Sequence, residues 1–218
     1  MDEKYVKQLL EMEGQELKLT EKKVNILVAA IEIFAEKGYS ATSTSEIAKR
    51  AGVAEGTIFR HYDSKKDLLL GITKPAILKM VVPYFASQMV EEVFKDEITS
   101  FDGVLRAFIT NRIEFVRKNI PLFKIVLQEI AFHNELQETF QESFLNQILP
   151  KISETIYIAQ KSGRLKDFSI PTTLRFIMST VMGFIITRFL IMPEAEWNEK
   201  EEIDNMVECI MNGISKNN

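Results

Sequence analysis

The chain has few of the residues that carry metal, redox or nucleophilic chemistry. Its 218 residues include one cysteine, Cys209, and two histidines, which excludes an internal disulfide and leaves too few ligands for a zinc site. It contains no glycine-rich phosphate loop and no nucleophile elbow. Glu129 and His133 share a helix face at four-residue spacing, but one acid and one base do not make a catalytic constellation. We therefore expect a protein that is not an enzyme and uses no cofactor and no metal.

The sequence also lacks a long apolar run and a targeting segment. Its N-terminal stretch is acidic and has no basic start followed by an apolar core, so it is not a secretory signal. The longest uncharged apolar run, residues 176–187, is shorter than the about 20 residues that span a membrane. We expect a cytoplasmic protein without a membrane span. Residues 1–19 are expected to be an N-terminal extension, either a short helix or a frayed arm.

The net charge of −4 is unusual for a nucleic-acid-binding protein until it is divided along the chain. Residues 18–67 hold nine Lys and Arg against seven Asp and Glu, a net of +2, and the two flanking stretches carry −3 each. A mildly basic region on an acidic chain favours local steering of a polyanion and predicts salt-sensitive binding. The composition, 46% hydrophobic and 27% charged, is that of a folded globular protein.

Residues 42–66 predict two short helices joined by a tight turn and followed by a third helix. Their sequence is TSTSEIAKRAGVAEGTIFRHYDSKK. Thr44 is placed to cap the first helix, and Gly52 stands where a helix commonly ends in a left-handed residue. The second helix is expected over residues 54–62, and Ser64 caps the third. This is the layout of a helix-turn-helix, whose second helix enters the major groove of DNA.

The same region resembles the DNA-binding domain of the TetR-type transcriptional repressors. The resemblance covers residues 26–69, about a fifth of the chain, where many positions agree in order and spacing. They include Phe34, Gly38-Tyr39, Thr44, Ile47-Ala48, Ala51-Gly52-Val53, Gly56-Thr57, residues 59–62 and Lys65. The resemblance implies a helix-turn-helix DNA-binding domain at residues 20–68 and a palindromic operator in double-stranded DNA as its partner.

The resemblance further implies which residues meet the DNA. They are Thr44, Ser45, Gly56, Thr57, Arg60, His61 and Lys65. Arg60 is expected to contact a base edge because the arginine fork matches the acceptors of guanine, and Lys65 is expected to clamp a phosphate. For His61, phosphate contact and packing remain equally open. Two positions depart from the family pattern: Phe59 lacks the hydroxyl of the tyrosine that is common there, and the charge of Glu55 would repel a nearby phosphate.

Beyond residue 68 the apolar residues recur at every third or fourth position, which predicts helices throughout. The expected helices cover residues 64–82, 101–116, 122–131, 135–161, 171–192 and 203–214. Pro75 and Pro83 should kink or end the first of these. The fold class is therefore all-α. An N-terminal three-helix helix-turn-helix DNA-binding domain is followed by a larger helical domain for ligand binding and dimerisation, residues 69–218.

The last two expected helices are more apolar than packing on one side requires. The candidate dimer-interface residues are Ile177, Val181, Phe184, Ile203, Val207 and Ile210. They can form half of a four-helix bundle across a two-fold axis, although ordinary core packing explains part of the pattern. A homodimer is the stronger interpretation, because a symmetric helix-turn-helix protein reads two half-sites about one turn apart.

Many of the 15 Phe and nine Met fall in the C-terminal part of the chain. The candidate ligand-binding residues there are Phe108, Arg112, Phe115, Phe132, His133, Phe144, Phe176 and Met182. Each is also explained as core, but aromatic and methionine side chains can line an adaptable cavity. The resemblance implies an effector in this part of the chain, and an apolar lining favours a hydrophobic one.

The sequence thus predicts a ligand-responsive repressor that binds a palindromic operator as a dimer and is released by a hydrophobic small molecule. A pendulum-like shift of residues 64–82 would transmit effector binding to the DNA-binding domain. It would change the distance between the two DNA-contacting helices of the dimer. The alternative is a DNA-binding regulator whose C-terminal domain binds a protein partner. The operator, the regulated genes, the effector and the sign of regulation stay open.

Overall fold

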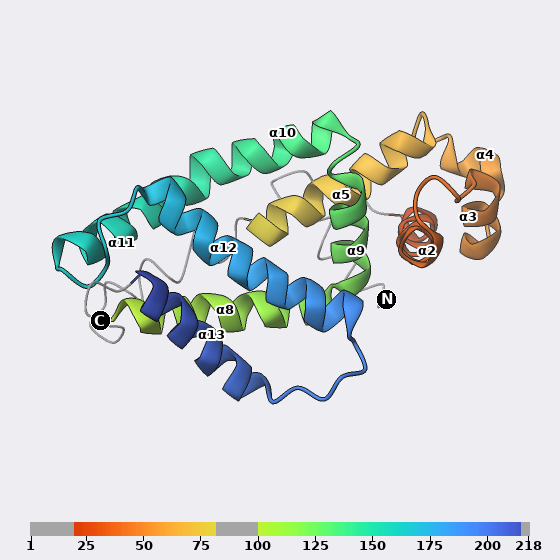
Figure 1. Ribbon diagram of the computed structural model, residues 1–218. Coiled ribbons are helices and arrows are strands. Elements are labelled where there is room, and N and C mark those ends of the chain that lie inside the picture. The colour runs from red at the N-terminus through yellow and green to blue at the C-terminus, as the bar shows by residue number, and fades with distance from the viewer. Residues whose placement is uncertain (1–19, 82–99, 215–218) are drawn as a thin grey trace. The chain divides into compact units, whose positions relative to one another are not determined.

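The computed structural model describes residues 20–81 and 100–214, which form helices and turns without a strand (Figure 1). In chain order the helices are α2 (Glu21–Lys37), α3 (Thr44–Ala51), α4 (Glu55–Ile58), α5 (Lys65–Val81), α8 (Phe101–Lys118), α9 (Ile120–Glu129), α10 (Asn134–Ser143), the π-helical η1 (Phe144–Ile148), α11 (Leu149–Lys161), α12 (Ile170–Ile186), the π-helical η2 (Thr187–Ile191) and α13 (Glu199–Ile214). The all-α fold class is confirmed. The expected N-terminal extension and Pro83 lie outside the described residues.

The chain divides into two compact units, and each unit combines two separate stretches of sequence. Unit 1 consists of the chain up to Val81 together with residues 119–141, and its described helices are α2 to α5, α9 and most of α10. Unit 2 consists of residues 82–118 and 142–218 and contains α8 and α11 to α13. The domain boundary expected at residue 68 stays a prediction, and α5 runs through that position without a break.

The core of unit 1 forms around α2. Thr20 begins this helix by accepting a hydrogen bond from the amide of Lys23, and eight of its apolar side chains are buried. α9 packs against both α2 and α5 and contributes Phe123, which is 2% exposed. Burial of apolar area is the main stabilising term in such a core. A helix from the middle of the chain therefore supports the N-terminal helices.

The turn between α3 and α4 has the expected glycine. Gly52 adopts φ 68° and ψ 31°, and its amide donates to the carbonyls of Ala48 and Lys49. A side chain at this left-handed position would be strained, so glycine suits it. The predicted cap at Thr44 is wrong by one residue, because Ser43 has the extended backbone of a cap and accepts from the amide of Glu46 at 3.2 Å. Ser64 caps α5 as predicted and accepts from the amide of Asp67 at 3.1 Å.

Pro75 does not end α5, although proline removes one helical hydrogen bond and crowds the carbonyl four residues earlier. That carbonyl belongs to Gly71. The flanking residues Ile72, Ala76 and Ile77 are buried, so packing holds the helix together across the proline. The helix expected over residues 64–82 is thus observed as Lys65–Val81, and Pro75 lies inside it.

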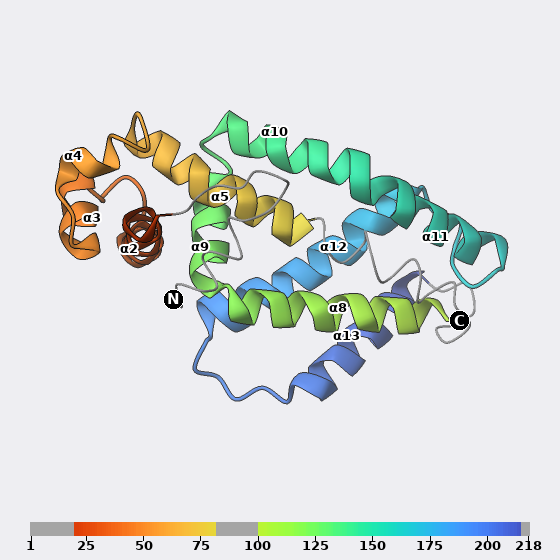
Figure 2. The same cartoon turned by 180° about the vertical axis from the view of Figure 1, so that it is seen from behind.

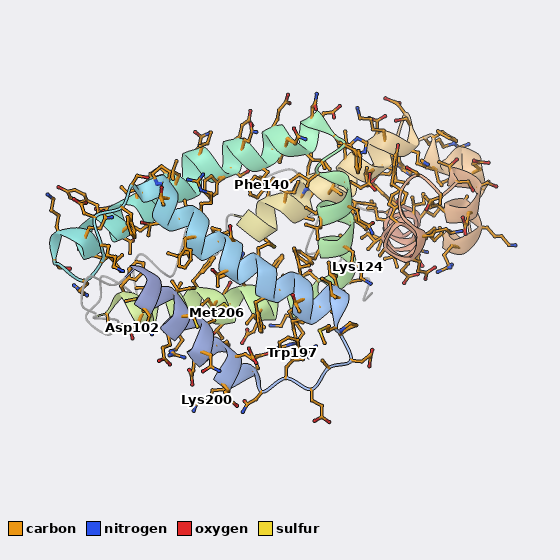
Figure 3. All side chains as sticks on the ribbon, in the orientation of Figure 1. Asp102, Lys124, Phe140, Trp197, Lys200 and Met206 are labelled. Carbon is orange, nitrogen blue, oxygen red and sulfur yellow. The ribbon has the colours of Figure 1, made fainter. Side chains whose placement is uncertain are left out.

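In unit 2, α8 packs against α12 and α13, and α11 packs against α12. Two ion pairs join α8 to α13: Arg106 with Asp204, and Arg117 with Glu199. Met206 of α13 is buried, whereas Trp197 lies on the loop that precedes this helix (Figure 3). The ring of Trp197 meets Phe184 of α12 edge to face, with centroids 5.6 Å apart. This loop therefore anchors α13 to α12.

Two π-helical segments interrupt what the sequence predicts as plain helices. η1 separates α10 from α11, and η2 extends α12 to Ile191. Pro150 is the second residue of α11 and follows directly after η1. In a regular α-helix its ring would crowd the carbonyl four residues earlier, and the wider π-helical turn accommodates the ring. Gly163, at φ 75°, ends the α11 region as predicted.

The helix of residues 170–191 is long and apolar enough to cross a membrane by length and composition alone, with a mean hydropathy of 1.7 over its best window. One such helix is weak evidence, because core helices of other proteins have the same properties. Among the described residues, 28% of that window is buried.

Candidate nucleic-acid interface

α3 and α4 form the helix-turn-helix and pack on each other, and α3 also packs on α2 (Figure 2). The expected second helix of residues 54–62 is too long, because α4 ends at Ile58. The amides of both His61 and Tyr62 donate to the carbonyl of Ile58, which turns the chain away from a regular helix. Residues 59–61 therefore form turns, and Arg60 follows the helix rather than lying within it.

The predicted DNA contacts gather on the surface of this motif. Ser45, Gly56, Arg60 and His61 are exposed, and Thr44 and Thr57 are partly exposed. A Cβ atom added at Gly56 would meet nothing within 4 Å, so open space lies in front of this backbone. The structure thus brings six of the seven residues to an accessible surface. Their roles at DNA stay predictions.

Lys65 has a different environment from the other six. Its ammonium donates to the carbonyl of Tyr39 at 2.9 Å and to that of Thr42 at 2.7 Å, and it lies 4.4 Å from the centroid of the Tyr39 ring. Two of the three ammonium donors therefore hold the turn between α2 and α3. In this arrangement Lys65 fixes the position of α3 relative to α5, a role that the sequence did not predict.

Thr44 and Glu55 join the starts of α3 and α4. The Thr44 hydroxyl donates to Oε1 of Glu55 at 2.6 Å. Glu55 is exposed and is the first residue of α4. The hydroxyl that the resemblance assigns to a phosphate is therefore already engaged by a carboxylate.

On the other side of α3, ion pairs join this helix to α2. Arg50 lies 3.4 Å from Glu32 and 3.6 Å from Glu36, and Lys37 lies 2.5 Å from Glu46. A shallow pocket of about 210 Å³ opens between these helices over Val28, Ala29 and Ala51. All five charged side chains in these ion pairs are more than a third exposed, so each ion pair adds little stability.

A second polar cluster lies where the start of α5 and the end of α9 meet the turn after α2. Nε2 of His133 is 3.3 Å from Oε2 of Glu129, both side chains are largely buried, and the Tyr39 ring meets His133 edge to face at 5.5 Å. Lys66 pairs with Glu135 at 2.5 Å. We call Tyr39, Lys66, Glu129, His133 and Glu135 the α9 cluster.

Two electrostatic effects follow from the α9 cluster. Burial raises the pKa of the Tyr39 phenol, and the Glu129 carboxylate raises it further. The hydrogen bond between Lys66 and Glu135 lowers the pKa of the carboxyl and raises that of the ammonium. The spacing of Glu129 and His133 predicts an acid and a base on one helix face, but it carries no information about Tyr39, which lies about 90 residues away.

The predicted ligand-binding residues fall in both units. Phe108, Arg112, Phe115, Phe144, Phe176 and Met182 belong to unit 2, whereas Phe132 and His133 belong to unit 1. Phe108 is buried, and the Arg112 guanidinium lies 5.3 Å from the Phe115 ring on the same helix. Phe132 is 81% exposed. Residue roles in ligand binding therefore stay predictions, and the six residues of unit 2 form the more coherent group.

Thr173 in unit 2 is a further candidate that the sequence does not reveal. This α12 residue is 1% exposed, and among the described residues its hydroxyl has no hydrogen-bond partner. A buried hydroxyl without a partner is costly, and this one follows one turn after the start of α12. Its threonine identity alone gave no signal, because threonine in a helix usually bonds to the preceding turn.

The predicted dimer residues lie mainly inside the protomer. Ile177, Val181, Ile203, Val207 and Ile210 are buried within one chain, and Phe184 packs on Trp197. The outer face of α12 instead presents Arg175, Phe176, Ser179 and Gly183, all exposed. The expected apolar stripes are thus largely buried within one chain, and their role in a dimer interface stays a prediction.

An exposed reader helix supported by two packed helices defines a helix-turn-helix DNA-binding protein. Residues 26–72 match the family described as "Bacterial regulatory proteins, tetR family". The resemblance of this region to the DNA-binding domain of TetR-family transcription regulators, seen in the sequence, is confirmed.

Similarity to known regulators extends over nearly the whole chain. The fatty acid metabolism regulator protein of Bacillus subtilis is 25% identical over 198 residues, which cover 88% of this chain and 95% of the relative. The uncharacterized HTH-type transcriptional regulator YvdT of the same organism is 29% identical and covers 74% of this chain and 81% of its own. These relatives are regulators rather than enzymes.

Solved structures share the fold. The fatty acid degradation regulator FadR from Bacillus halodurans aligns with a TM-score of 0.69 and 20% identity over 92% of this chain and 98% of its own. FadR from Bacillus subtilis, solved in complex with stearoyl-CoA, aligns with a TM-score of 0.63 and 23% identity over 87% of this chain and 98% of its own.

Proposed function

We propose that the protein is a dimeric transcriptional repressor that binds a palindromic operator and is released by a long-chain acyl-CoA. The observation that carries this proposal is the similarity over 88% of the chain to a regulator of fatty acid metabolism. The fold shared with a protein in complex with stearoyl-CoA supports the same class of effector. The hydrophobic effector expected from the sequence thus becomes a specific chemical class.

The composition of unit 2 suits an acyl-CoA. An acyl chain needs apolar lining, for which Phe108 of α8 and Phe144 of η1 are candidates. The thioester carbonyl is a hydrogen-bond acceptor, and the buried Thr173 hydroxyl is a donor without a partner among the described residues. The anionic head of the ligand would require cations, and Arg112 is the candidate on α8.

Dimerisation is supported by the outer face of α12. Phe176 is 43% exposed there, and a Cβ at Gly183 would meet nothing within 4 Å. A face with a small residue and an exposed aromatic is suited to close approach of a symmetric copy. Two copies of the reader would then contact two half-sites about one helical turn apart.

The α9 cluster provides a path for the effector signal inside unit 1. Tyr39 lies in the turn after α2, Glu129 is the last residue of α9, and His133 follows that helix. The neighbouring Lys65 holds the same turn from the start of α5. A displacement of α9 or α5 therefore changes the position of α3 directly. An effector acts through such a path only by its different affinity for the two arrangements.

Operator binding and effector release are tested in one assay. Bound sequences are first selected from a random duplex pool, and the recovered operator is titrated with protein in the presence of stearoyl-CoA, coenzyme A or stearate. We expect a palindrome, and a loss of operator affinity with stearoyl-CoA that is at least tenfold larger than with the other two. Thermodynamic linkage requires the operator to weaken stearoyl-CoA binding by the same factor.

The assay is repeated with the matched variant Thr173→Val, which keeps the shape of the side chain and removes the hydroxyl. This variant should keep operator binding and lose sensitivity to stearoyl-CoA. Unchanged operator affinity at saturating stearoyl-CoA would contradict the effector proposal. Absence of any enriched sequence at low salt would contradict the operator.

A further inference from the structure

We infer that Glu55 is a base-reading residue that selects cytosine in each half-site, held in place by Thr44. This inference rests on the proposed operator binding and adds a specificity determinant to it. Glu55 is the first residue of α4 and is exposed. In a helix-turn-helix the N-terminal residues of the second helix are those that contact base edges.

The Glu55 side chain is held in one arrangement. Its Oε1 accepts the hydroxyl proton of Thr44 at 2.6 Å, and Thr44 is itself fixed as the first residue of α3. A glutamate side chain that is free in solution loses rotamer entropy when it is immobilised. Because the hydrogen bond already restricts the side chain in the DNA-free protein, part of this entropy loss precedes binding. The carboxylate is therefore preorganised at the start of α4.

Glu55 also differs from the other acids nearby in the charge of its partner. Glu46 pairs with Lys37 at 2.5 Å, and Glu36 lies 3.6 Å from Arg50. Within residues 20–81 and 100–214, the recorded polar contact of the Glu55 carboxylate is a neutral hydroxyl, and no ion pair to it is found. A carboxylate has about four acceptor sites, so one hydroxyl leaves capacity for a further donor.

The major groove offers one base whose edge suits such an acceptor. Cytosine presents its N4 amino group, to which glutamate and aspartate accept hydrogen bonds. Guanine presents two acceptors, and thymine presents an acceptor beside a methyl group, so neither donates to a carboxylate. Adenine places an acceptor next to its amino group, which opposes the negative charge. Cytosine therefore satisfies Glu55 with the least repulsion.

The same charge makes the other sequences worse. A carboxylate near the duplex lowers the affinity for every phosphate backbone, because backbone attraction is electrostatic. Only a site that presents an amino group offsets this loss. Glu55 thus raises specificity largely by penalising wrong sequences. The repulsion that the sequence suggested for this residue is part of its function.

The test is selection from a random duplex pool with the full-length chain and its Glu55→Gln variant. We expect the wild type to prefer cytosine at one position of each half-site. In the variant that preference should fall about tenfold, with affinity for unrelated duplexes increased and other positions unchanged. Glu36→Gln is the control, since it removes an equal charge on α2 and should leave the cytosine preference intact.

Thr44 provides an independent measurement of the positioning. Thr44→Val removes the hydroxyl and should relax the same cytosine position, whereas Thr44→Ser keeps the hydroxyl and should preserve it. Uniformly tighter binding by Glu55→Gln, with the base preference unchanged at every position, would overturn the inference and leave Glu55 as an electrostatic repellent. Failure of the wild type to enrich any sequence would instead refute the operator proposal.

Discussion

Gly56 has no side chain beyond hydrogen, and it lies on the surface that is proposed to approach DNA most closely. Its backbone is helical, and an added Cβ would touch nothing in the protein. Gly56→Ala should therefore leave the thermal midpoint unchanged or raise stability by up to about 1 kcal/mol, since alanine favours helix. We expect operator affinity to fall at least tenfold, measured by titration of a labelled duplex. The thermal midpoint is the internal control, and equal operator affinity in both proteins would contradict close approach at Gly56.

Tyr62 provides a prediction for pH dependence. Burial raises the pKa of this phenol from 10.0 to about 12. The native state therefore holds the proton more tightly than the unfolded state, and the resulting stability is present below pH 10 and is lost as the pH rises towards 12. Its size is on the order of 2 kcal/mol. Titration of phenolate absorbance should show a late-ionising tyrosine that disappears in Tyr62→Phe. Ionisation of every tyrosine in a single step near pH 10 would contradict it.

Residue roles could be predicted only in part from the sequence. The order and spacing of residues 44–65 identified the reader surface, because a local motif fixes local geometry. Lys65 and Tyr39 were harder to interpret. Their contacts join residues 26 positions apart, and Tyr39 additionally meets His133 from a distant helix. Periodicity carries no information about such pairs.

The N-terminal cap of α3 leads to a prediction at the level of helices. Ser43→Ala removes the oxygen that accepts the Glu46 amide and should lower the free energy of unfolding by about 1 kcal/mol. Ser45→Ala is the matched control, because Ser45 is an exposed neighbour within the helix and should stay within about 0.5 kcal/mol of wild type. Chemical denaturation measures both. A larger effect for Ser45 than for Ser43 would place the cap elsewhere.

Helix positions followed well from the sequence where proline and glycine mark the ends. Gly52, Gly163 and Pro171 each stand at a helix boundary, as their backbone preferences require. The cap could also have been found, since Ser43 and Glu46 have the serine-to-glutamate spacing of a capping box. The π-helical segments could not, because they change the hydrogen bonding without changing the apolar period. The early end of α4 depends on bonds to one carbonyl, that of Ile58, and has no sequence signal.

The proposed dimer gives a prediction for the whole molecule. Gly183→Arg places a long charged side chain on the exposed face of α12, where the protomer has open space. The protomer should keep its helical content, while the dimer should dissociate, with at least a tenfold weaker association measured by sedimentation equilibrium. Glu154→Arg, on an exposed position of α11, adds the same side chain and should leave association unchanged. A Gly183→Arg protein that remains dimeric would move the interface away from this face.

The split composition of unit 1 limits how the protein can be recombined with others. The helix-turn-helix is continuous in sequence, but its supporting core is completed by α9, whose Leu122, Phe123 and Ile125 are buried. A chimera that transfers only the first 81 residues onto another regulator would replace that partner with a foreign surface. The unit of exchange between such regulators is therefore the reader together with α9, and not the reader alone.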